Sequence, residues 1–168
     1  MGSCASASRH RRRLAACTRE SCTDWYPPKG LVKVLSVYDG DTLTVAAPIH
    51  GHIPAAELFS FRIRLAGIDA PELRTHDAGE KRAGQFAAEC LREHVIDKLV
   101  WMEPTREREM YGRVLARINV DGGDVATWML TRKLALPYDG KTKREPIGGW
   151  LHYVASSPLW NDTSESHV

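Results

Sequence analysis

Two stretches, YDGDT at Tyr38–Thr42 and RLAGIDAPE at Arg64–Glu72, decide how this chain is expected to fold and what it is expected to do. Together they set four carboxylates and an arginine into otherwise apolar, strand-like sequence. Strands normally exclude acidic residues unless the charge is needed. A cluster of acids repels itself unless a hard cation neutralises it, and hard cations take oxygen ligands. Carboxylates that can bind a metal cation, next to an arginine that can bind an anion, indicate phosphate chemistry.

A third stretch, Tyr111-Gly112-Arg113, follows the first two. Each of the three motifs alone is a weak signal, but their order and spacing are specific. Asp-Gly-Asp-Thr, then Arg-x4-Asp-x-Pro-Glu, then Tyr-Gly-Arg resembles the staphylococcal nuclease (thermonuclease) family. The resemblance covers roughly Leu31 to Tyr138, which is most of the chain.

Length and composition indicate one folded domain between two tails. The chain has 168 residues, 43% of them hydrophobic, which suits a globular protein with its own core. We expect a disordered basic tail over residues 1–25, a nuclease-like domain over 26–160 and a disordered C-terminal tail over 161–168. The net charge of +2 is too small to indicate nucleic-acid binding by itself, so that inference rests on the motifs. No apolar run approaches the ~20 residues that span a bilayer.

Hydrophobic periodicity predicts a mainly β, α+β domain. Strands are expected at residues 31–38, 41–47, 58–68, 98–103 and 112–120, and helices at 77–95 and 125–133, with a third, short helix near 150–155. Asp77 and Glu80 have the spacing of an N-terminal capping box. The charged segment 104–110 is expected to be a loop. This element order, together with the resemblance, implies a five-stranded OB-fold barrel with two to three helices.

The resemblance also implies a metal site. It assigns Asp41 and Asp69 as carboxylate ligands and the backbone carbonyl of Ala70 as a further ligand, with Asp39 holding a metal-bound water. Two carboxylates leave coordination positions for water and substrate, which suits Ca²⁺ and its loose geometry. The preference for Ca²⁺ over Mg²⁺ or Mn²⁺ comes from the family, because the residue types do not separate these ions.

Catalytic and substrate-binding roles follow from the same resemblance. Glu72 is expected to act on the attacking water as general base, and Arg64 and Arg113 to clamp the phosphate with forked guanidinium groups. Tyr111 would contact a neighbouring phosphate and Tyr138 would stack on a base. Stacking ignores base identity, so single-stranded DNA and RNA are the expected substrates, cut with little sequence specificity to leave 3′-phosphate ends.

Other interpretations remain open for these residues. Asp39-Gly40 is a good hairpin turn whatever the function. Asp69 could cap a turn, and Arg64 and Arg113 could pair with Glu72. The whole domain could be a catalytically inactive OB-type binding module or a membrane-tethered interaction module. Inactive copies tend to lose the acids and arginines, whereas this chain keeps them.

The first six residues fit an N-myristoylation pattern, with Gly2 as acceptor and Ser6 at the Ser/Thr position. Cys4 would then be a palmitoylation site, and the basic run at 10–13 could lie on anionic lipid. This interpretation places the chain on the cytoplasmic face of a membrane. The alternative is a plain solvated leader, which would leave the chain cytoplasmic or without an assigned location. Nothing in the sequence indicates an obligate partner, so a monomer is expected.

Overall fold

Six strands of one sheet dominate the computed structural model, which describes residues 11–18, 21, 27–48, 58–108 and 112–160 and the side chains of all of these except 106–108. Residues 11–15 form an exposed helical turn. In the described parts of the chain, no helix is both long and apolar enough to cross a membrane. The remaining elements are β1 (Gly30–Val37), β2 (Thr42–Pro48), β3 (Leu58–Leu65), β4 (Ile68–Asp69), α2 (Ala78–Val95), β5 (Leu99–Arg108), β6 (Val114–Val120), β7 (Gly123–Asp124), α3 (Val125–Thr131), β8 (Leu136–Pro137) and α4 (Gly149–Ala155).

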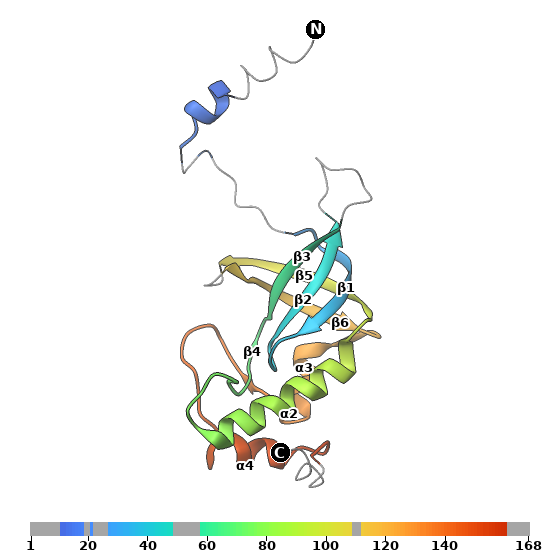
Figure 1. Ribbon diagram of the computed structural model, residues 1–168, viewed down its shortest axis with the longest axis vertical. Coiled ribbons are helices and arrows are strands. Elements are labelled where there is room, and N and C mark those ends of the chain that lie inside the picture. Colours follow the sequence, from blue (N-terminus) through green and yellow to red (C-terminus); the bar gives the residue numbers. More distant parts are fainter. Residues whose placement is uncertain (1–10, 19–20, 22–26, 49–57, 109–111, 161–168) are drawn as a thin grey trace.

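Five of the strands close into a barrel. The sheet runs β3-β2-β1-β5-β6-β7 with antiparallel neighbours, and a further parallel pairing joins β3 to β6. Ile63 pairs there with Val114, and Arg64 with Leu115. This closure confirms the predicted five-stranded OB-fold barrel of a mainly β, α+β domain. Figure 1 shows β1, β2, β3, β5 and β6 wrapped around one another above the helices.

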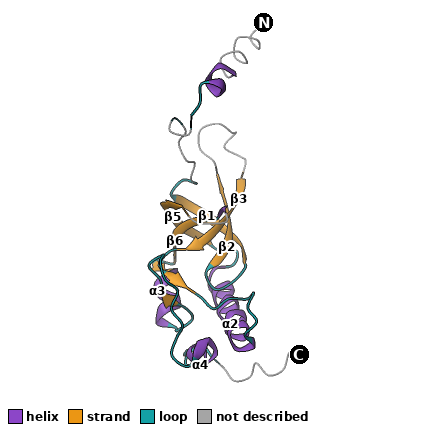
Figure 2. Ribbon diagram, turned by 90° about the vertical axis from the view of Figure 1, so that its left-hand side faces the viewer, coloured by secondary structure: helices purple, strands orange, loops and turns teal. Residues whose placement is uncertain are grey.

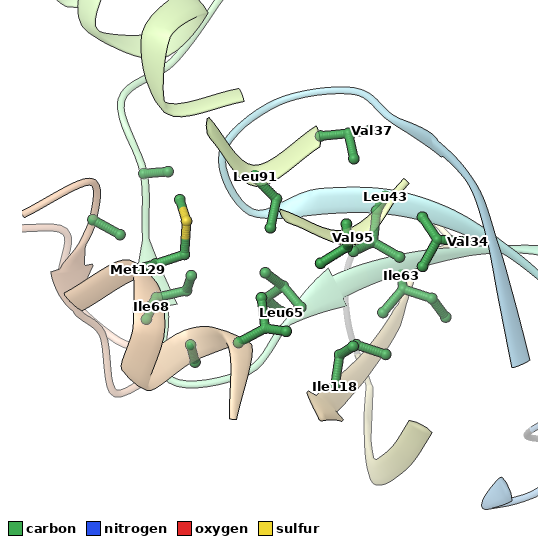
Figure 3. Packing of buried hydrophobic residues seen from close by; sticks show 14 of the residues in the cluster. Val34, Val37, Leu43, Ile63, Leu65, Ile68, Leu91, Val95, Ile118 and Met129 are labelled. Carbon is green, nitrogen blue, oxygen red and sulfur yellow. The ribbon is translucent and has the colours of Figure 1, made fainter. Parts of the chain in front are cut away.

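The helices cover one end of the barrel, and both views place α2 and α3 beneath the strands with α4 below α2 (Figures 1 and 2). The apolar stripe of α2 supplies Leu91 and Val95 to the core, where they are fully buried. They meet barrel side chains such as Leu43 and Ile63, as well as Met129 from α3 (Figure 3). Barrel and helices therefore share a single hydrophobic core, which fixes the loops between them.

Two of the predicted strand and loop boundaries are wrong, and the local sequence explains both. The strand expected over 58–68 ends at Leu65, because a turn at Ala66–Gly67 separates it from β4 and Gly67 takes a left-handed φ of 85°. The segment expected to be a charged loop continues β5 to Arg108. Pro104 lies where the register with β6 begins to shift, and such irregularities accommodate a residue without an N–H.

Candidate active site

The two predicted metal carboxylates meet on one guanidinium group. Arg64 Nη2 lies 3.1 Å from Asp41 Oδ2 and 3.2 Å from Asp69 Oδ1. Arg64 Nη1 donates to the carbonyl oxygens of Ile68 (2.9 Å) and Leu65 (3.3 Å). All three charged residues are buried, with exposures of 7% for Asp41, 5% for Arg64 and 4% for Asp69. Because both carboxylates bond the same nitrogen, acids from separate chain segments are held within a few ångströms of each other.

Strand pairing explains this convergence. Thr42 pairs with Arg64 across β2 and β3, which sets Asp41 at the strand end beside the arginine. The turn before it is fixed by the Asp41 N–H, which donates to Asp39 Oδ1 at 3.1 Å. A Cβ added at Gly40 would lie 2.7 Å from Ala70 Cβ, so only glycine lets the first acidic loop pack this closely on the second. Asp69 arrives through β4, which follows the turn at Gly67.

The predicted second arginine reaches Asp41 through a hydroxyl. Arg113 Nη1 donates to Thr42 Oγ1 at 3.2 Å, and Thr42 Oγ1 donates to Asp41 Oδ1 at 2.9 Å. Arg113 directly precedes β6, whose parallel pairing with β3 brings it across the barrel. The structure therefore places guanidinium groups from β3 and from the start of β6 at one acidic centre.

Glu72, the predicted base, lies at the open side of this centre, where its side chain is half exposed. Lys143 Nζ bridges it to the buried acids, at 2.5 Å from Glu72 Oε1 and 3.2 Å from Asp69 Oδ1. Partial burial lowers the pKa of the Lys143 ammonium, but the hydrogen bond to Glu72 and the charge of Asp69 outweigh it, and the pKa is raised overall. Lys143 is therefore a charged part of the site, and it was not predicted from the sequence.

Glu80 holds the backbone of Glu72, and it too was not predicted to belong to the site. Asp77 caps α2 as expected, accepting from the Glu80 N–H at 2.7 Å. The reciprocal half of the predicted capping box is wrong, because Asp77 N–H donates to Thr75 Oγ1 and the Glu80 carboxylate accepts from the Glu72 N–H at 3.2 Å. A Cβ on Gly84 would lie 2.9 Å from the Pro71 carbonyl, so α2 packs directly on the chain that carries Glu72.

The remaining predicted residues divide into two groups. Tyr138 lies at the centre, with its ring 5.3 Å from Arg64 Cζ, because β8 pairs with β4 and the Tyr138 N–H donates to the Gly67 carbonyl at 3.0 Å. Ala70 is buried beside Gly40. The other group, Tyr111, Gly2 and Cys4, lies outside the described residues. Their predicted roles stay predictions.

Comparison with known proteins gives the same family as the motifs. The family model described as "Staphylococcal nuclease homologue" matches residues 62–147, just over half of the chain. This chain belongs to the staphylococcal nuclease family. The matched range contains the second and third motifs, with Arg64, Asp69, Glu72 and Arg113, and it ends after Lys143.

Curated relatives named "Probable endonuclease LCL3" match parts of the chain. The protein from Paracoccidioides lutzii is 30% identical over 160 residues, which cover 82% of this chain and 45% of the relative. The one from Colletotrichum graminicola is 34% identical over 98 residues, covering 56% and 36%. One from Saccharomyces cerevisiae is 35% identical over 88 residues, covering 49% and 32%. The chain thus spans less than half the length of these relatives.

The donor set fits the cation that the family implies. Asp41 and Asp69 offer hard oxygen ligands within 3.2 Å of the same Arg64 nitrogen. The Ala70 carbonyl lies next in the chain, and the Asp39 carboxylate accepts from the Asp41 N–H. Among the residues that the structure describes, no three His, Cys, Asp or Glu side chains form a metal-binding group. Two carboxylates and a backbone carbonyl are hard oxygen donors, the type that binds divalent cations such as Ca²⁺, Mg²⁺ and Mn²⁺.

Burial makes the nuclease-like centre sensitive to pH. Desolvation raises the pKa of Asp41 from 3.8 to about 7; Arg64 lowers it, and the neighbouring Asp39 charge raises it further. The folded protein therefore holds a proton between about pH 4 and 7 that the unfolded chain has lost. This contribution to stability is fully present below about pH 4 and is lost as the pH rises through about 7.

We expect the melting temperature in chelator to fall between pH 5 and 8, and a divalent cation to restore it at pH 8 but change it little at pH 5. Differential scanning fluorimetry across this range measures both effects. Asp41→Asn removes the titration while keeping the side-chain shape, so its curve should be flatter than that of the wild type. Parallel curves for the two proteins would exclude Asp41 as the group responsible.

Proposed function

We propose that this chain is a Ca²⁺-dependent nuclease that hydrolyses single-stranded DNA and RNA with little sequence specificity. The observation that carries the proposal is the meeting of Asp41 and Asp69 on one Arg64 nitrogen, with Glu72 joined to the same cluster through Lys143. Family membership and the endonuclease names of the relatives support the reaction class. The inactive-module alternative is less favoured, because the acids and arginines are present and most of them converge.

The residues divide the work of hydrolysis among them. Asp41, Asp69 and the Ala70 carbonyl would hold the cation, which polarises a phosphoryl oxygen when it is bound. Glu72 accepts a proton from water as the water oxygen bonds to phosphorus. Arg113 faces the charge that builds on the phosphoryl oxygens. Arg64 was expected to clamp the phosphate with Arg113, but its two terminal nitrogens contact both acids and two backbone carbonyls, so we assign it the role of holding the acids together. The P–O5′ bond breaks, the leaving oxygen takes a proton, and the products are a 3′-phosphate and a 5′-hydroxyl.

The half-exposed position of Glu72 agrees with this assignment. A base that acts on water must reach solvent, and the half-exposed Glu72 side chain does so while its backbone is held by Glu80 and by the packing of Pro71 on Gly84. Tyr138 supplies an aromatic face at the edge of the centre, beside Arg64. Stacking on such a face is independent of base identity, which supports weak sequence preference.

Digestion of denatured DNA with Ca²⁺, and then with chelator, tests the cation requirement. We expect cleavage to fall by at least about 10²-fold on chelation, because the charge of the transition state loses its strongest neutralising group. Re-addition of Ca²⁺, Mg²⁺ or Mn²⁺ separately identifies the ion. Cleavage that persists in chelator would reject the metal assignment, and binding without cleavage would favour the inactive module.

A membrane anchor at Gly2 and Cys4 is a separate proposal, supported by the acylation pattern alone. It does not affect the proposed chemistry.

A further inference from the structure

An exposed cluster beside the proposed active site joins one tyrosine to two arginines. Arg62 Cζ lies 4.6 Å from the centre of the Tyr38 ring, and Arg74 Cζ lies 5.7 Å from it. All three residues are exposed. Within the side chains that the structure describes, neither arginine forms an ion pair with a carboxylate or a hydrogen bond. The Tyr38 ring thus contacts two guanidinium groups, and no described carboxylate forms an ion pair with either of them.

Each member of the cluster stands next to a residue of the site. Tyr38 opens the turn that carries Asp39 and Asp41, and its N–H donates to the Thr42 carbonyl at 2.8 Å. Arg62 precedes Arg64 by two residues on β3, so the two side chains leave the same face of the strand. Arg74 follows Glu72 by two residues. The cluster therefore lies beside the active site, on the same three chain segments that carry its residues.

The positive charge of Arg62 and Arg74 suits a position beside an acidic centre that must accept a polyanion. The centre holds the carboxylates of Asp39, Asp41, Asp69 and Glu72, and these groups repel the phosphates of a strand on either side of the scissile one. Guanidinium groups bind phosphate oxygens bidentately, and an aromatic face that stacks on a guanidinium leaves its N–H edge available. Two arginines held by one ring are therefore already ordered for an extended phosphate backbone.

We propose that Arg62 and Arg74, positioned by the Tyr38 ring, bind the backbone phosphates of a nucleic-acid strand next to the one being cleaved. This inference rests on the proposed nuclease function. Its ligand is a single strand long enough to extend beyond the scissile phosphate. A small phosphodiester that fills the centre alone does not reach the cluster.

Fluorescence anisotropy with a labelled 20-nucleotide DNA strand tests the proposal, in a Glu72→Gln background with Ca²⁺ present so that the probe survives. Adding Arg62→Gln and Arg74→Gln should weaken binding several-fold at 50 mM salt. It should also flatten the slope of log affinity against log salt by about 1.4, since each phosphate contact to a single strand contributes about 0.7. Tyr38→Ala should weaken binding in the same direction, and Tyr38→Phe, which keeps the ring, should not.

A matched control comes from the residue that follows α3, Arg132, which lies over the Trp128 ring with its Cζ 4.5 Å from the ring centre. Arg132→Gln removes a comparable stacked guanidinium and should change neither affinity nor slope. In the Glu72 wild-type background, hydrolysis of bis(p-nitrophenyl) phosphate should be unchanged by the Arg62→Gln and Arg74→Gln pair.

The outcomes separate the two proposals. If the Glu72→Gln parent binds the strand and the double arginine variant binds it equally well with the same slope, the cluster is surface packing only and the proposed nuclease function stands. If the double variant also loses hydrolysis of the small diester, the arginines act at the centre itself and the proposal is wrong. A parent that binds no strand would overturn both proposals.

Discussion

Arg64→Met should damage the fold and the reaction together. The substitution keeps the length of the side chain but removes the charge that holds Asp41 and Asp69, so two buried carboxylates lose their shared partner. Breaking a buried ion pair in this way typically costs about 3–5 kcal/mol of unfolding free energy. Activity on denatured DNA should fall by at least about 10²-fold, because the acids lose their fixed position. Urea denaturation and a cleavage assay measure the two effects.

Calcium should partly rescue the stability of this variant, because a bound cation replaces the missing positive charge between the two acids. Arg62→Met is the matched control, since Arg62 lies on the same face of β3 but is exposed. Its effect on stability should stay within about 0.5 kcal/mol. Equal losses of unfolding free energy for the two variants would show that Arg64 does not hold the acidic centre together.

Glu72→Gln should separate chemistry from stability. Glutamine can still accept a hydrogen bond from Lys143, but it cannot take a proton from water. We expect the single-turnover rate to fall by about 10²–10⁴-fold. The unfolding free energy should change by less than about 0.5 kcal/mol, because the side chain is half exposed. Rapid-quench kinetics and chemical denaturation provide the measurements.

Glu89→Gln, an exposed change on α2 that weakens an ion pair with Arg92, serves as the control and should leave the rate unaltered. A Glu72→Gln enzyme that retains wild-type rates would assign the base to another group. A variant that loses stability as well as rate would mean that the ion pair with Lys143 supports the fold.

The family resemblance named most of the residues that meet at the centre, and the structure shows the local pairing that brings them together. A tight turn and the register of β2 with β3 are enough to set Asp41 beside Arg64, and Asp69 follows five residues later in the chain. Such short-range geometry is visible in the motifs themselves. The barrel needed the resemblance, because strand patterns alone do not specify that β3 pairs with β6.

Lys143 could not be predicted in the same way. It lies in a segment without regular structure, where a basic run would ordinarily be solvated. Its place beside Glu72 depends on the two-residue pairing of β8 with β4, which carries no periodic signal. Glu80 was assigned to a capping box because the spacing from Asp77 fits, and only the packing of α2 against Pro71 reveals that its carboxylate holds the Glu72 backbone instead.

The seam between β3 and β6 makes the site the product of a late event in folding. Ile63 meets Val114 only after the chain has made about fifty further residues, and long-range pairings of this kind form slowly because the intervening loop must first be closed. Arg113 reaches Thr42 with that same seam. A nascent chain that ends before β6 therefore carries the acids of the first two motifs but lacks the Arg113 contact that completes the arrangement.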